Sequence, residues 1–208
     1  MLLDFLRRAF RRIHQVLVQN RRRERLAECL GHTLGSEALQ LLDVGCGSGE
    51  VAECLQRRLP LAEVRGVDVL VRPHTRIPVE AFDGKKLPFP DDSFDYCLLV
   101  DVLHHTERPQ ELLRECLRVA RRGIVVKDHL CDSRWDRARL RLMDFVGNWG
   151  HGVVLPYNYL SREQWRRLGA DLRFSAVHWQ EQLRLYPAPF AGLFDSGLHF
   201  VACFEPCR

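Results

Sequence analysis

The chain has 208 residues, of which 46% are hydrophobic, and it carries a formal net charge of +4. That length and composition suit one α/β domain with a full core. No apolar run reaches the roughly 18 residues that a membrane-spanning helix needs, which excludes such a span. Arginines interrupt the apolar residues at the N-terminus, so no secretory signal is expected. Eight scattered cysteines without a C-x-x-C motif predict reduced thiols in a cytoplasmic protein.

Residues 1–30 form a basic N-terminal arm. They contain eight arginines and three acidic residues, a net +5, so the rest of the chain is close to neutral. Apolar residues fall at helical spacings in this arm: Leu2, Leu3, Leu6, Phe10, Ile13, Leu17 and Leu26. Such a helix could make peripheral contact with an anionic membrane or bind an acidic partner. We favour the alternative, an amphipathic helix packed on the domain with its arginines in solvent.

A glycine-rich turn comes next. The stretch Leu41 to Glu50 reads LLDVGCGSGE, in which an apolar run precedes three glycines and a helix-compatible segment follows them. Glycine allows a tight turn, and the start of a helix offers unpaired N–H groups to a ligand. Asp68 lies 19 residues beyond Gly49, where a carboxylate can accept hydrogen bonds from ribose hydroxyls. The pattern therefore predicts a nucleotide site.

The spacing of the glycines in this turn indicates which class of nucleotide it could bind. It reads G-x-G-x-G and not the G-x-G-x-x-G of dinucleotide enzymes, and no P-loop motif is present. Asp43 lies two residues before the first glycine. A carboxylate there would repel a phosphate, so a cationic ligand fits better.

Strands and helices alternate along the chain, which predicts a largely parallel sheet. In chain order we expect strand 39–44, helix 49–58, strand 64–69, strand 78–82, strand 94–100, helix 109–120 and strand 123–128. Only eight residues, 70–77, connect the second strand to the third, so a helix there must be shortened or absent. Because no linker or repeat appears, residues 1–208 are expected to form a single domain.

Residues 129–160 form an insert that we interpret as a lid. An aromatic helix face is expected from Trp135, Ala138, Leu142, Phe145 and Trp149, and aromatic residues on a helix are more often core than substrate contacts. The glycine- and aromatic-rich segment 147–159 suits a mobile lid, with His151, Tyr157 and Tyr159 lining a substrate pocket. Beyond it, Ser161 and Gln164 predict a capping box for a helix that ends near Gly169. Strands 172–183 and 197–204 would complete the sheet.

Motifs in this order resemble those of class I S-adenosylmethionine (SAM)-dependent methyltransferases. The glycine turn resembles the first motif, and Asp83-Gly84 with the segment 87–95 resembles the stretch that holds adenine. The run Phe94 to His105, FDYCLLVDVLHH, is typical of the small-molecule branch that includes ubiquinone- and menaquinone-type methyltransferases. The resemblance covers residues 39–128, under half of the chain.

The resemblance implies a Rossmann-like class I methyltransferase fold, with a mostly parallel seven-stranded sheet and helices on both faces. It also implies SAM as cofactor and S-adenosylhomocysteine as product, with an N-terminal helix capping the cleft. The implied cofactor-binding residues are Asp43, Gly45, Cys46, Gly47, Gly49, Asp68, Asp83, Gly84 and Asp101. By the same resemblance, Asp83 would accept a hydrogen bond from the adenine amino group.

Candidate bases lie where strands end, because an open α/β sheet binds its ligands at the carboxyl ends of its strands. His104 and His105 follow the strand at 94–100 and are the first candidates for a catalytic base. One of them could face the substrate, while the other packs against the protein or caps the following turn. Asp128 and His129 end the next strand, where a locally bonded loop histidine is the simpler reading. A metal held by Asp128 with His104 or His105 is conceivable, but no full ligand set can be assembled, so no metal is expected.

The acceptor is expected to be a small organic molecule, apolar or aromatic, with its O, N or C atom left open. The sequence Asp101-Val102-Leu103-His104 stands where nucleobase methyltransferases carry [ND]-P-P-[YFW], which argues against nucleic acid. A lipid or quinone head group would suit both the lid and the basic arm. Two other functions stay open: a non-catalytic SAM-binding or scaffold subunit, and an RNA methyltransferase recruited through the arm.

Overall fold

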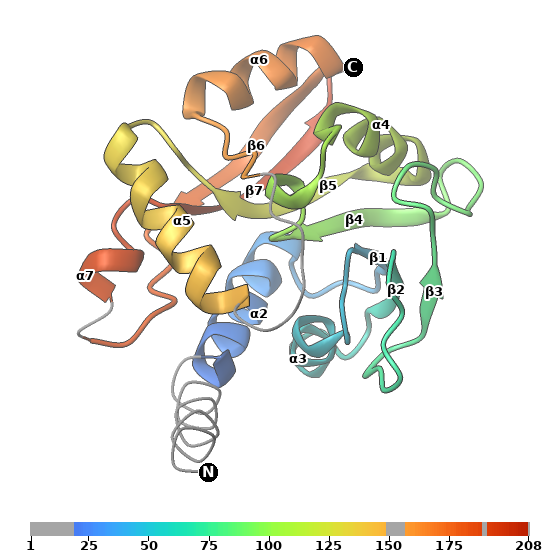
Figure 1. The fold of residues 1–208 in the computed structure, drawn as a ribbon. Helices are drawn as coiled ribbons and strands as arrows, with labels where there is room; N and C mark the ends of the chain where they lie inside the picture. Colours follow the sequence, from blue (N-terminus) through green and yellow to red (C-terminus); the bar gives the residue numbers. More distant parts are fainter. Residues whose placement is uncertain (1–18, 149–156, 189–190, 208) are drawn as a thin grey trace.

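A seven-stranded sheet forms the centre of the computed structural model, which describes residues 19–148, 157–188 and 191–207 (Figure 1). The strand order is β3-β2-β1-β4-β5-β7-β6. The strands are β1 (Gln40–Val44), β2 (Glu63–Asp68), β3 (Val79–Ala81), β4 (Phe94–Val100), β5 (Ala120–His129), β6 (Phe174–Glu181) and β7 (His199–Pro206). All neighbours pair in parallel except β7, which runs antiparallel to β5 and to β6. The predicted fold, a mostly parallel sheet of the class I methyltransferase type, is therefore confirmed.

Helices cover both faces of this sheet. They are α2 (Asn20–Leu34), α3 (Glu50–Arg58), α4 (Pro109–Val119), α5 (Arg134–Asn148), α6 (Arg162–Leu172), α7 (Ala191–Phe194) and the short 3-10 helix η2 (Leu103–His105). One buried core joins α4 and α6 to the sheet, and a second joins α2 and α3 to its other face. A smaller cluster around Leu140 and Leu198 attaches α5 near the ends of β5 and β7.

The register of the sheet decides where a site can form. Val44 pairs with Val67 and with Leu99, and Val100 pairs with Lys127. The carboxyl ends of β1, β2, β4 and β5 therefore meet at one edge, and the residues that follow these four strands lie close together there.

Two element boundaries differ from the prediction by three residues. β5 begins at Ala120 instead of residue 123, because no Pro-Gly-Gly turn separates α4 from the strand and the chain passes directly from helix to strand. The helix after Ser161 continues past Gly169 to Leu172 and ends at Arg173, which has a φ of 55°. A Cβ at Gly169 would meet the Phe174 carbonyl oxygen at 2.9 Å, so this glycine permits close packing and does not end the helix.

Several other local predictions are confirmed. No helix lies between β2 and β3, a stretch that the structure describes throughout. Ser161 and Gln164 form the capping box at the start of α6. All eight cysteines are free thiols, and only Cys207 is exposed.

The N-terminal helix packs on the domain for the part that is described. α2 extends four residues beyond the expected arm and buries Leu26, Ala27, Cys29 and Leu30 against α3 and the sheet. The arm's remaining apolar residues, 2–17, lie outside the described residues, as do His151 and Trp149. Within the described ranges, no helix is both long and apolar enough to cross a membrane.

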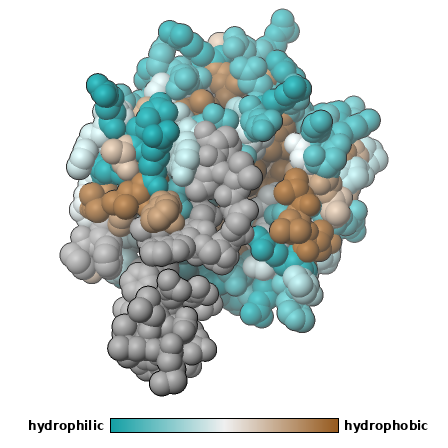
Figure 2. Space-filling model, viewed as in Figure 1, coloured by the Kyte–Doolittle hydropathy of each residue, from teal (hydrophilic) through white to brown (hydrophobic). Residues whose placement is uncertain are grey.

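The aromatic face of α5 is not core. Trp135 is 66% exposed, and Leu142 and Phe145 are also largely exposed. Figure 2 shows hydrophobic side chains gathered on the surface at the position of α5 and α7. The helix instead buries Leu140 and Asp144, which lie on its other side.

Candidate active site

The turn between β1 and α3 has the geometry of a ligand cradle. Gly45, Gly47 and Gly49 all have positive φ, at 74°, 60° and 76°. A Cβ at Gly45 would meet Val102 Cγ2 at 2.7 Å, so the turn lies tightly against the segment after β4. At Gly47 nothing lies within 4 Å of that position, so a ligand can reach its backbone closely.

Asp68, at the end of β2, is tied to this turn. Its Oδ2 accepts a hydrogen bond from the Gly47 N–H at 2.7 Å, and its Oδ1 accepts one from the Leu70 N–H at 2.9 Å. Each carboxylate oxygen still has a second lone pair for an outside donor. Asp68 is therefore held in place with the capacity to bind hydroxyl groups.

Asp43 and Cys46 lie on the inner side of the same turn. Asp43 is 4% exposed, and burial, together with the nearby charge of Asp68, raises the pKa of its carboxyl to about 7. The Cys46 thiol lies against Gly66, and burial raises its pKa well above the usual value. The thiol of Cys46 is therefore neutral, and the carboxyl of Asp43 titrates near pH 7. A positively charged ligand would be stabilised there by the ionised form of Asp43.

Asp83 and Gly84 lie in the loop after β3, and Asp83 is exposed. Its Oδ1 accepts hydrogen bonds from the Lys85 and Lys86 N–H groups, both at 2.8 Å, and these bonds lower the pKa of the carboxyl. Asp83 is thus fixed by its own loop in the ionised form, a hydrogen-bond acceptor at the edge of the site.

Asp101 follows β4 in a left-handed conformation, with a φ of 58°. Its two carboxylate oxygens pair with Lys127 of β5 and Arg22 of α2. Burial alone would raise the pKa of Asp101, but the charges of Lys127 and Arg22 hold it well below its usual range. Lys127 is fully buried, and Arg22 connects the N-terminal helix directly to the site.

The two candidate histidines have different environments. His104 is 3% exposed, and its Nδ1 lies 2.7 Å from Asp128 Oδ1. Burial would lower the pKa of His104, but the adjacent Asp128 charge raises it overall. His105 is half-buried, and its Nδ1 has no hydrogen-bond partner among the described residues. Burial together with the charge of His104 lowers the pKa of His105.

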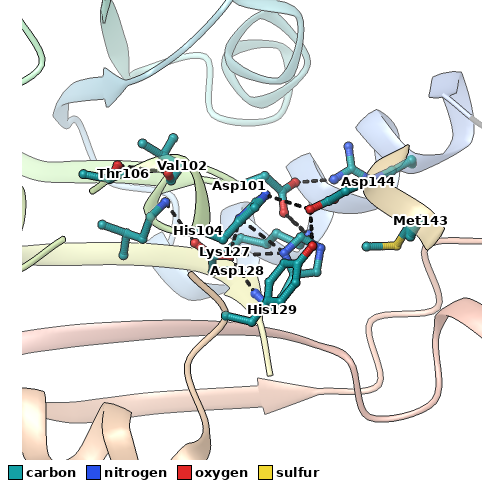
Figure 3. Close-up of polar contacts among 12 residues, drawn as sticks. Asp101, Val102, His104, Thr106, Lys127, Asp128, His129, Met143 and Asp144 are labelled. Atoms are coloured by element: carbon teal, nitrogen blue, oxygen red, sulfur yellow. Dashed lines mark hydrogen bonds and ion pairs between the residues drawn. The ribbon is translucent and has the colours of Figure 1, made fainter. Parts of the chain in front are cut away.

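Asp128 is the centre of a buried polar cluster at the ends of β4 and β5 (Figure 3). Its Oδ2 accepts from the Leu103 N–H at 3.0 Å, and its Oδ1 accepts from the His129 N–H at 2.8 Å. His129 Nδ1 lies 3.2 Å from the same Oδ1 and 3.3 Å from His104 Nδ1. His129 is thus part of the cluster and not a simple loop histidine.

Tyr159 joins this cluster from the described end of the proposed lid. It is 4% exposed, its hydroxyl donates to Asp144 of α5, and its ring lies 5.8 Å from the His104 ring. Asn158 anchors the same segment, since its N–H donates to the His104 carbonyl at 3.2 Å. Tyr157 is half-buried, with Arg141 over its ring. His151 lies outside the described residues.

Sequence reasoning missed four residues of this region: Arg22, Lys127, Asp144 and His199. His199 is fully buried, lies opposite His129 in the β5–β7 pairing, and has no hydrogen-bond partner in the part of the chain that is described. Lys127 carried a visible signal, because a charged residue that directly follows the apolar run 124–126 within a strand needs a buried partner. Arg22 and Asp144 carried none, because their partners lie far away in the sequence.

The known proteins that this chain resembles are methyltransferases. Residues 42–126 match a family described as a methyltransferase domain. A protein of Mycobacterium avium named an uncharacterized methyltransferase is 39% identical over 104 residues, 45% of this chain and 40% of that protein. Trans-aconitate 2-methyltransferase from Pseudomonas aeruginosa is 28% identical, over 69% of this chain and 58% of its own. The chain therefore spans less than two thirds of the length of these relatives.

A solved structure shares the fold. It is 1,6-didemethyltoxoflavin-N1-methyltransferase from Burkholderia thailandensis, determined with 1,6-didemethyltoxoflavin and S-adenosylhomocysteine bound. The two structures align with a TM-score of 0.63 at 19% identity, over 88% of this chain and 77% of that one. Identity this low establishes the likeness of fold alone.

Proposed function

We propose that this chain, which carries a class I SAM-dependent methyltransferase domain, moves a methyl group from SAM to a small organic acceptor. The observation that carries the proposal is the bond from the Gly47 N–H to Asp68, which fixes a carboxylate beside an open glycine turn. SAM has ribose hydroxyls for such a carboxylate and no phosphate to be repelled by it.

The residues around the turn fit this cofactor. Asp68 would accept from the ribose hydroxyls, and Asp83 would accept from the adenine amino group. Asp43 would interact with the positive charge of SAM. Because its pKa is about 7, a cationic ligand can lower that pKa and hold the carboxyl in its ionised form. Bound SAM would supply a methyl group activated by its sulfonium, so the chain's main task is to align the two reactants.

We assign the role of base, for an acceptor that must lose a proton, to His105 in preference to His104. His105 is half-buried, and its lowered pKa keeps it neutral near pH 7, the form that accepts a proton. His104 is held in the interior by Asp128 and is better suited to fix the geometry of η2. His105→Ala should reduce methyl transfer, whereas His178→Ala, which removes an exposed histidine of β6, should not.

The acceptor is proposed to be small and apolar or aromatic, with Tyr157, Tyr159 and His151 lining its pocket. The Pseudomonas and Burkholderia relatives are named for small-molecule substrates, which supports this class without identifying the molecule. Free cysteines throughout are consistent with a reducing, cytoplasmic location. Peripheral membrane contact through the basic arm remains part of the same hypothesis.

Transfer of a labelled methyl group tests the proposal. The purified chain would be incubated with methyl-labelled SAM and with phenols, quinones, lipids or carboxylic acids in turn. Label should reach at least one acceptor class. Asp68→Ala should reduce the transfer strongly, while Asp171→Ala, an exposed change on α6, should leave it intact. Tight SAM binding without transfer to any class would favour a non-catalytic SAM-binding subunit instead. Transfer to RNA alone would contradict the small-molecule acceptor.

A further inference from the structure

Four buried or half-buried side chains converge at the carboxyl ends of β4 and β5: Asp101, His104, Asp128 and His129. Each offers one ligand atom, and these atoms all lie within 4.8 Å of one another. Figure 3 shows His104, Asp128 and His129 turned toward a common point, with Lys127 and Asp101 beside them. Three of the four are at most 3% exposed.

The spacing of the three inner atoms matches a coordination triangle. His104 Nδ1 and His129 Nδ1 are 3.3 Å apart, and His129 Nδ1 and Asp128 Oδ1 are 3.2 Å apart. Ligands at about 2.0–2.1 Å from a tetrahedral ion lie about 3.3 Å from one another. The third edge, His104 Nδ1 to Asp128 Oδ1, is 2.7 Å and must lengthen by a few tenths of an ångström.

The two ring nitrogens of His129 lack good hydrogen-bond partners among the protein groups described. Asp128 Oδ1 already accepts from the His129 N–H at 2.8 Å and faces His104 Nδ1 at 2.7 Å, which uses both of its lone pairs. The contact of His129 Nδ1 with that oxygen is therefore a third and weaker one. Its other nitrogen, Nε2, is buried without a hydrogen-bond partner among the described residues, and Asp101 Oδ1 lies 3.8 Å from it. A buried imidazole in this condition points to a group that the polypeptide does not supply.

The nearby cationic side chains do not neutralise Asp128, so its carboxylate is available to bind a metal ion. Lys127 and Arg22 are the cations of this region, and both pair with Asp101. Within the described part of the chain, no lysine or arginine forms an ion pair with Asp128, whose charge is met by the two histidines and two backbone N–H groups. Asp144 adds a further carboxylate, 4.0 Å from His104 Nε2. Negative charge at the cluster therefore offsets the repulsion from Lys127 and Arg22.

We propose that His104, Asp128 and His129 bind a divalent transition-metal ion of the zinc or iron(II) class. Two imidazoles and one carboxylate are the ligands that these ions accept. Because Asp101 is held by Lys127 and Arg22, it is left out of the proposed ligand set, and water would take the remaining position. The inference departs from the sequence expectation of no metal, and it does not depend on SAM binding.

Metal titration of chelator-treated protein tests the site. Zn2+ binding would be measured by calorimetry and Co2+ binding by visible absorption, for wild type, His129→Asn, Asp128→Asn and the exposed control His178→Ala. Wild type and the control should bind one equivalent, and the two ligand variants should bind at least about 100-fold more weakly, since even outer partners of a metal site matter 10–100-fold. Bound Co2+ should show bands typical of nitrogen and oxygen ligands.

Two results would overturn the inference: no Zn2+ binding by folded wild type, or equal binding by wild type and both ligand variants, as free thiols would give. Circular dichroism checks that His129→Asn and Asp128→Asn fold. SAM binding, measured on the same samples, separates the outcomes. Wild type that binds SAM but no Zn2+ contradicts only the metal site, whereas wild type that binds Zn2+ but no SAM contradicts only the proposed function.

Discussion

SAM binding should depend on pH through Asp43. This carboxyl is 4% exposed and has a pKa of about 7 in the free chain, so it is about one-tenth ionised at pH 6 and about nine-tenths ionised at pH 8. A cationic ligand binds the ionised form and lowers its pKa. Binding should therefore release a proton at pH 6, and affinity should rise about tenfold, or ~1.4 kcal/mol, from pH 6 to pH 8.

Calorimetry at pH 6, 7 and 8, in buffers with different ionisation enthalpies, measures both the affinity and the proton release. Nearly one proton should leave at pH 6 and almost none at pH 8. Asp43→Asn separates this group from His104, whose pKa is raised by the adjacent Asp128, and should abolish the Asp43 part of the pH dependence. Equal affinity at pH 6 and pH 8 in wild type, or an unchanged profile in Asp43→Asn, would refute the role given to Asp43.

The remaining predictions concern stability and catalysis. Asp43→Asn should raise the free energy of unfolding of the ligand-free protein above pH 7, by at most about 4 kcal/mol. Folding raises the pKa of the Asp43 carboxyl to about 7, so its ionised form destabilises the folded state above that pH, and the substitution removes this charge; urea titration at pH 8 tests the prediction. Gly47→Ala should cost about 1–2 kcal/mol from its φ of 60° and also weaken SAM binding, whereas a loss of stability alone would mean that this face does not touch the cofactor. Ser161→Ala should cost about 1 kcal/mol through the lost capping box and leave SAM affinity unchanged. His105→Ala should lower kcat about 10²–10⁴-fold with little change in KM, and an effect no larger than that of His178→Ala would exclude His105 as the base.

The parts of the fold and site that the sequence predicts are local ones. The glycine turn, Asp68 and the capping box each depend on residues within one strand–turn–helix unit, whose spacing is visible in the chain. The parallel sheet follows from the alternation of elements. His104 could be located for the same reason, because it directly follows a recognisable buried strand.

The partners of these residues could not be predicted. Arg22 and Asp101 are 79 positions apart, and His104 and Asp128 meet only because β4 and β5 pair in one register. The different environments of His104 and His105 depend on burial, which adjacent positions in the sequence do not reveal. The exposure of Trp135 likewise depends on which side of α5 meets the sheet.

The most direct test of the account is calorimetric binding of SAM and S-adenosylhomocysteine to wild type, Asp68→Ala and the exposed control Asp171→Ala. Wild type and the control should bind both compounds. Asp68→Ala should lose about 10–150-fold in affinity, because hydrogen bonds from ribose hydroxyls to a carboxylate contribute ~1.5–3 kcal/mol. Folded wild type that binds neither compound would contradict the central claim, and equal binding by Asp68→Ala would contradict the site assigned to the cofactor.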